Sequence, residues 1–237
     1  MPLADRVVLV TGATGVLGRA LVAAFAAEGC RLGLAGTDAD GLAAVAAEHG
    51  LSDDRWAAGV GDLSRPDEAL AAVSAVETRF GRVDVVLHAV GGYAGGTPVA
   101  ELAASDMTGM LDQHLWTTLY IVQAVLPAMI ARGWGRILAV TTPVATTPAP
   151  KMAPYAVAKA AEETLLRVVA KEVAGTGVTA NLVSVKKIDE ARERETRPSP
   201  KNASWTTPDE IAAVMRQLCS DEGAAVNGAR IPLDGRG

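Results

Sequence analysis

The sequence is poor in aromatic residues, cysteine and histidine, and each shortage excludes a class of protein. Aromatic residues make up 4% of the 237 residues, and there are only 2 cysteines and 3 histidines. Cys30 and Cys219 cannot supply a disulfide framework, and the histidines show no metal-ligand spacing. The sequence therefore predicts no metal site and a reducing compartment, the cytoplasm.

Basic charge and long apolar runs are also lacking. Lys and Arg number 22 against 27 Asp and Glu, which gives a formal net charge of -5. Such a balance leaves no electrostatic footprint for nucleic acid. No apolar run approaches the roughly 18 residues that cross a bilayer, and residues 1–6 show no secretion signal. We therefore expect neither nucleic acid nor a membrane as a partner.

What the chain does contain is a regular alternation of short apolar runs and longer segments of helical period, with 49% hydrophobic residues overall. Continuous apolar strands between helices are typical of a parallel sheet covered on both faces. The pattern predicts an α/β fold, with one doubly wound Rossmann-type sheet in a single domain over 1–237. The expected strands are 6–11, 31–36, 56–60, 83–89, 136–142, 178–184 and 230–234. The expected helices are 16–28, 42–48, 66–80, 102–131, 154–174 and 208–220.

One composition shift interrupts this pattern. Residues 186–206 are rich in charged residues, proline and serine. This composition is typical both of a lid over a binding site and of an ordinary surface loop. The sequence leaves both interpretations open.

A glycine-rich turn follows the first expected strand and opens the first helix. Gly12, Gly15 and Gly18 allow a tight turn, a close approach of a pyrophosphate and tight helix–strand packing. The helix N-terminus then points free N–H groups at phosphates. This position favours dinucleotide binding over a turn without a ligand.

The residues that choose between NAD and NADP follow the second strand. A carboxylate there accepts bonds from the NAD ribose, and an arginine holds the extra phosphate of NADP. Gly36 leaves room for a phosphate and Thr37 could donate a hydrogen bond to it, whereas Asp38 would repel it. Asp38 could equally cap the next helix. Asp62, after the third strand, could accept from the adenine amino group. We favour NADP(H) over NAD(H).

Tyr155 and Lys159 lie one turn apart at the start of an expected helix, on the same face. A free phenol has a pKa near 10, and a neighbouring ammonium favours the phenolate. The pair predicts a phenol that protonates a carbonyl oxygen as hydride reaches its carbon, or does the reverse.

The order of these motifs resembles the short-chain dehydrogenase/reductase family over nearly the whole chain. The stretches that carry the resemblance are 11–18, 61–63, 83–87, 135–138, Tyr155 with Lys159, 180–181 and 227–231.

The resemblance implies a role for each matching residue. Tyr155 would be the catalytic acid/base, Lys159 would hold the nicotinamide ribose and lower the tyrosine pKa, and the family's serine falls on Thr142. The residues that the resemblance places on the cofactor are Gly12, Thr14, Gly15, Val16, Leu17, Gly18, Thr37, Asp62, Leu63, Ala89, Val90, Gly91, Tyr155 and Lys159.

Three positions depart from the family pattern. The family's Asn-Asn-Ala-Gly is 88–91 here and begins with His88, its catalytic asparagine falls on His114, and its Pro-Gly after the sixth strand is Val185-Lys186. An imidazole could relay a proton at His114, since its ordinary pKa is near 6.5, or it could simply pack. We expect His88 to be structural.

Segments 90–96, 113–118 and 204–208 are similar to those of dihydropteridine reductases. Tyr93 could stack on a flat ring, and Trp116 and Trp205 could add an apolar wall or belong to ordinary packing.

The sequence thus predicts an NAD(P)H-dependent oxidoreductase acting on a small-molecule carbonyl, imine or quinonoid, pterin-like ring. The alternatives are a redox-silent dinucleotide sensor or scaffold, and a non-redox isomerase or cyclase. The resemblance also implies a homo-oligomer, a dimer or tetramer, through helix residues such as Leu119, Val122, Leu165 and Val168.

Overall fold

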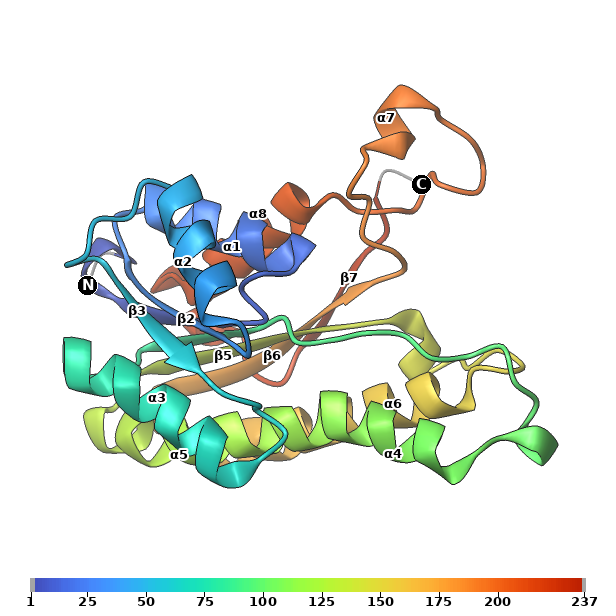
Figure 1. Cartoon of the computed structure of the whole chain (residues 1–237), viewed down its shortest axis with the longest axis horizontal. Coiled ribbons are helices and arrows are strands. Elements are labelled where there is room, and N and C mark those ends of the chain that lie inside the picture. Colours follow the sequence, from blue (N-terminus) through green and yellow to red (C-terminus); the bar gives the residue numbers. More distant parts are fainter. Residues whose placement is uncertain (1–2, 236–237) are drawn as a thin grey trace.

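The computed structural model describes residues 3–235, which form one sheet between two helical layers (Figure 1). All strands are parallel, in the order β3-β2-β1-β4-β5-β6-β7. Their bounds are β1 (Val7–Thr11), β2 (Arg31–Gly36), β3 (Trp56–Val60), β4 (Val85–His88), β5 (Gly135–Thr141), β6 (Val178–Val185) and β7 (Arg230–Leu233). The predicted doubly wound fold is confirmed, with every expected strand placed within two residues of its observed bounds.

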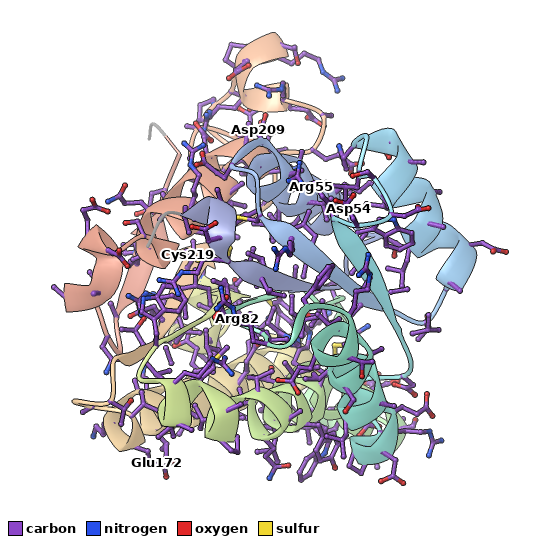
Figure 2. The ribbon with its side chains drawn as sticks, turned by 90° about the vertical axis from the view of Figure 1, so that its left-hand side faces the viewer. Asp54, Arg55, Arg82, Glu172, Asp209 and Cys219 are labelled. Carbon is purple, nitrogen blue, oxygen red and sulfur yellow. The ribbon has the colours of Figure 1, made fainter. Side chains whose placement is uncertain are left out.

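The helices divide between the two faces of the sheet, as Figure 1 shows. One layer holds α1 (Val16–Ala27), α2 (Ala39–Glu48) and α8 (Pro208–Cys219). The other holds α3 (Pro66–Phe80), α4 (Ala104–Leu111), α5 (Thr117–Arg132) and α6 (Ala153–Glu172). Figure 2 shows the layers from another side, with Cys219 in the first and Glu172, at the end of α6, in the second.

Each layer buries its own apolar cluster against the sheet. Phe25, Leu42 and Met215 belong to the cluster under α1, α2 and α8. Met129 and Leu166 belong to the cluster under α3, α5 and α6. The strands are apolar on both faces because each face is covered, which is why they appear as continuous runs in the sequence.

The expected single helix over 102–131 is interrupted. A π-helical turn, η3 (Asp112–Trp116), joins α4 to α5. Such turns carry an extra residue and often occur at functional sites. Hydrophobic periodicity does not reveal this turn, because one inserted residue shifts the helical period only locally, and the polar residues Asp112, Gln113 and His114 are equally compatible with an α-helix.

The same segment corrects the expectation that no run could cross a bilayer. Over Ala104–Arg132 the helix is 29 residues long, with a mean hydropathy of 1.3 in its most apolar window. By length and composition alone it could span a membrane, but 39% of that window is buried in the protein. It is a core helix of the second layer, packed against α3 and α6.

The segment after β6 is ordered by hydrogen bonds. It contains α7 (Glu193–Thr196), which projects beyond the sheet in Figure 1, and a parallel bridge between Ile188 and Thr206. Asp189 accepts bonds from the backbone N–H groups of Glu193 and Arg194. Its role as a lid remains a prediction.

Gly18 allows α1 to lie close to the turn that precedes it. A Cβ atom at Gly18 would lie 2.1 Å from the Gly12 carbonyl oxygen and 2.7 Å from the Ala13 Cα. These are backbone atoms, so the chain itself would have to move. The predicted close helix–strand approach is therefore present.

Gly18→Ala is expected to lower the free energy of unfolding by about 2–3 kcal/mol, because an added methyl overpacks the turn. Gly109→Ala is the matched control, since Gly109 is also helical and has nothing within 4 Å of an added Cβ. That change should be neutral or stabilising by up to ~1 kcal/mol. Urea unfolding followed by circular dichroism measures both, and equal effects would contradict the packing argument.

Candidate active site

Two adjoining cavities lie at the carboxyl ends of the strands. The first, about 380 Å³, contains Tyr155 and Lys159, and the second, about 610 Å³, lies at the ends of β2 and β3. Both are lined by Gly15 and by 89–91, so they adjoin beside the point where strand order reverses between β1 and β4. Open parallel sheets bind ligands at such a point.

The residues that the resemblance places on the cofactor line these cavities. The first cavity contains Gly15, Val16, Leu17, Gly18, Ala89, Val90, Gly91, Tyr155 and Lys159, and the second contains Gly12, Thr14, Thr37, Asp62 and Leu63. Gly15 is the N-cap of α1 and makes no side-chain cap, and the first turn carries no acidic residue. The free N–H groups of this turn are therefore open to an anion.

The two predicted carboxylates near the second cavity differ in their contacts. Asp62 Oδ1 accepts from Ser64 N at 3.0 Å and from Ser64 Oγ at 2.7 Å, which holds the pKa of Asp62 below its usual range. Asp38 is the N-cap residue of α2, but its side chain makes no cap bond and packs close to Gly41. Gly36 and Thr37 line the cavity and Asp38 does not.

Tyr155 and Lys159 line the first cavity from the same face of α6, one turn apart. Lys159 is 5% exposed, and its Nζ donates to Val140 O at 2.8 Å and to Glu162 Oε2 at 2.7 Å. Its charge is thus balanced by a buried carboxylate. Glu162 is fully buried, and that burial raises its pKa while Lys159 lowers it.

The expected lowering of the tyrosine pKa is wrong for this structure. Burial raises the pKa of Tyr155 to about 12, the Glu162 carboxylate adds to the rise, and hydrogen bonding to Thr142 opposes it. Desolvation disfavours the phenolate, and Lys159 is already engaged by Glu162. The sequence spacing showed the cation but not the carboxylate that neutralises it.

Thr142 lies just after β5 and is buried, but the cavity is lined at this strand end by Val140 and Thr141. The Thr142 hydroxyl accepts from Val144 N at 3.4 Å, and its carbonyl accepts from Arg230 Nη2 at 2.9 Å. Thr142 therefore adjoins the cavity through its contact with Tyr155, and its bond to a substrate carbonyl remains a prediction.

His114 lines the first cavity beside Tyr155, whereas His88 is buried and does not line it. Burial, with a smaller contribution from the Lys159 charge, lowers the pKa of each to about 3. His88 bonds Thr11 Oγ1 at 2.9 Å and Thr117 Oγ1 at 3.2 Å, consistent with the structural role expected for it.

His114 is fully buried, and its ring packs edge-on against Tyr155 at 5.6 Å between centroids. Its Nε2 lies 3.1 Å from Gly92 O, an acceptor, so Nε2 carries the proton and Nδ1 is an unpartnered acceptor. A relay through a charged imidazolium would be unfavourable near neutral pH. If His114 relays a proton, it must do so as a neutral imidazole.

Both histidines should make the protein sensitive to acid. Folding lowers the pKa of each histidine. The unfolded chain therefore becomes protonated at these side chains near pH 6.5, whereas the folded chain becomes protonated there only near pH 3. Stability is expected to fall as the pH drops from 6.5, by on the order of 3 kcal/mol per histidine at pH 4. His114→Asn should flatten this loss in urea midpoints; a slope identical to that of the wild type would contradict the assignment.

The aromatic residues near the site divide into two groups. Tyr93 is 61% exposed, its ring lies 5.3 Å from that of Tyr155 in an edge-on arrangement, and it lines a small cavity separate from the first, so its stacking on a flat substrate stays a prediction. Trp116 stacks on Tyr120 outside the cavities, and Trp205 is buried beneath Lys187. Trp205 therefore packs within the chain, whereas Trp116 is 38% exposed, and a role for either as an apolar wall of the site stays a prediction.

Sequence reasoning missed several charged residues at the site. Glu162 and Glu163 are buried on α6, with Glu163 accepting from Thr141 Oγ1 at 2.7 Å and from Arg230 Nε at 2.9 Å. Lys186 and Lys187 line the first cavity. Glu162 follows Lys159 by one helical turn, and that spacing was the one available signal.

Comparison with known proteins agrees with this geometry. The profile of the short chain dehydrogenase family matches residues 6–200. D-threitol dehydrogenase of Mycolicibacterium smegmatis is 31% identical, over 97% of this chain and 92% of its own. The crystal structure of a short-chain glucose/ribitol dehydrogenase from Brucella melitensis is 30% identical with a TM-score of 0.85, over 98% of this chain and 96% of its own. Levodione reductase is 29% identical with a TM-score of 0.86, over the same shares.

Proposed function

Because this chain belongs to the short-chain dehydrogenase/reductase family and is an NAD(P)-dependent oxidoreductase, we propose that Tyr155 exchanges a proton with a small carbonyl or imine substrate. The observation that carries this proposal is the position of Tyr155 and Lys159 in a cleft that continues to the glycine turn. A nicotinamide bound in this cleft supplies the hydride, and the chain supplies orientation and the proton.

The cleft has the features that a dinucleotide needs. Gly12 and Gly18 keep the turn free of side chains, and the open N-terminus of α1 suits a diphosphate. Lys159 is placed to hold a ribose hydroxyl through the Nζ proton that Val140 and Glu162 leave free. Tyr155, in its acid form, donates to the substrate oxygen or nitrogen as hydride arrives.

We infer NADP(H) in preference to NAD(H). Gly36 and Thr37 line the cavity at the end of β2, and no carboxylate from this strand end lines it, because Asp38 turns toward Gly41. Parallel fluorescence titrations with NADPH and NADH test the choice. Tighter binding of NADH would overturn it.

The substrate class is narrower than the family alone implies. The exposed Tyr93 ring beside Tyr155 favours a small planar carbonyl, imine or quinonoid ring, and a pterin remains one candidate in that class. None of the relatives named for this chain is a dihydropteridine reductase. The similarity to D-threitol dehydrogenase adds small polyols to the substrates that should be tested, beside planar carbonyls, imines and pterins. Measuring the turnover of each of these substrates with the cofactor that binds more tightly identifies the substrate class. Binding without any consumption would favour a redox-silent sensor, and conversion with unchanged dinucleotide would favour an isomerase.

We also propose that the chain forms a dimer or tetramer and that 186–206 closes over the substrate. Val168 is 45% exposed and Val157 is 46% exposed on α6, which leaves an apolar face available. Val122 was expected at this interface, but it is buried within the chain and cannot contribute to it. Light scattering after size exclusion measures the assembly, and a monomer would contradict it.

A further inference from the structure

Lys186 and Lys187 follow β6 and line the same cavity as Gly15–Gly18 at the N-terminus of α1. Both lysines are exposed. Two features that attract anions, a helix N-terminus and a pair of ammonium groups, therefore border one space.

The charges around this cavity are one-sided. No Asp or Glu is among the described residues that line it, and Lys159, its third cation, is engaged by Glu162. Within residues 3–235, Lys186 forms no ion pair. A positive site of this kind stands out in a chain whose net charge is -5.

The lysines also lie on an anchored segment. Lys187 Nζ lies 3.6 Å from the centroid of the Trp205 ring, which is 8% exposed. The Lys187 carbonyl accepts from Thr206 N at 3.1 Å, and Asp189 N donates to Thr206 O at 2.8 Å. The backbone under both ammonium groups is thus fixed, so less entropy is lost when they bind an anion.

We propose that Lys186 and Lys187 form an anion site that binds the diphosphate of the dinucleotide, together with the N-terminus of α1. This inference rests on the proposed function, since it assumes that the cleft holds a dinucleotide. The same chemistry could serve an anionic group of the substrate, or the additional phosphate of NADP. The test must therefore separate these three sources.

The experiment titrates the full chain with NADPH, NADH and ADP-ribose, which keeps the diphosphate but lacks the nicotinamide. The variants are Lys186→Gln, Lys187→Gln and the double variant, with Lys186→Arg/Lys187→Arg as the charge-preserving pair. Lys201→Gln is the matched control, because Lys201 is an exposed lysine of the same segment that does not line the cavity.

All three ligands should bind the double variant at least about tenfold more weakly than the wild type, and its affinity should vary less with salt. The arginine pair and Lys201→Gln should bind as the wild type does. A loss confined to NADPH would assign the lysines to its extra phosphate, and unchanged dinucleotide affinity with a raised KM for an anionic substrate would assign them to the substrate. Either result would overturn the proposal. Wild-type protein that binds none of the three ligands would contradict the proposed function itself.

Discussion

Tyr155→Phe is expected to lower kcat by about 100- to 10,000-fold, which is the usual contribution of a positioned acid or base. The phenyl ring preserves the packing against Tyr93 and His114, so only the proton is removed. Affinity for the dinucleotide should stay within a few-fold, because the substitution leaves the glycine turn and Lys159 unchanged. Steady-state kinetics with the identified substrate and a cofactor titration measure the two quantities.

Tyr93→Phe is the matched control for this result. Tyr93 is also a tyrosine, and its ring lies 5.3 Å from that of Tyr155, but it is exposed and does not line the first cavity. Its loss should change kcat by less than about tenfold, because it supplies contact area and no proton. Unchanged turnover in Tyr155→Phe would eliminate the mechanism, whatever the control shows.

Glu162→Gln is expected to move the pH dependence of the reaction toward acid. In the wild type, burial first and the Glu162 carboxylate second raise the pKa of Tyr155 to about 12, so the phenol keeps its proton through neutral pH. Reduction of the substrate needs that proton, so its rate should fall only in strong alkali. Oxidation needs the phenolate, so its rate should rise with pH. Without the carboxylate the pKa of Tyr155 falls, so each change should occur at lower pH.

Two measurements separate this effect from damage to the fold. Ultraviolet absorption of tyrosinate, compared with the same titration in a Tyr155→Phe background, reports the phenol directly without substrate. Glu172→Gln is the control, since Glu172 is exposed at the far end of α6 (Figure 2). An unshifted tyrosine in a folded Glu162→Gln protein would show that the carboxylate does not govern Tyr155.

The parts of the fold that were predicted from sequence are those that depend on local pattern. Continuous apolar strands, the glycine turn and the one-turn spacing of Tyr155 and Lys159 each carry their own signal over a few residues. The state of Tyr155 could not be predicted this way, because it depends on how deeply α6 is buried and on which carboxylate reaches Lys159. The same holds for Val122, whose burial is decided by packing between distant elements.

The π-helical turn over Asp112–Trp116 has a consequence for how this chain tolerates length changes. A π-turn accommodates one residue more than an α-turn, so deleting one residue there would let the two helices merge. The merger would rotate everything before it by roughly 100° relative to everything after it. Met110, which lines the second cavity, would then turn away while Thr118 kept its contact with Glu162. His114 lies within this turn and packs against Tyr155, so a single-codon deletion there should disturb the surroundings of Tyr155 as well as the second cavity.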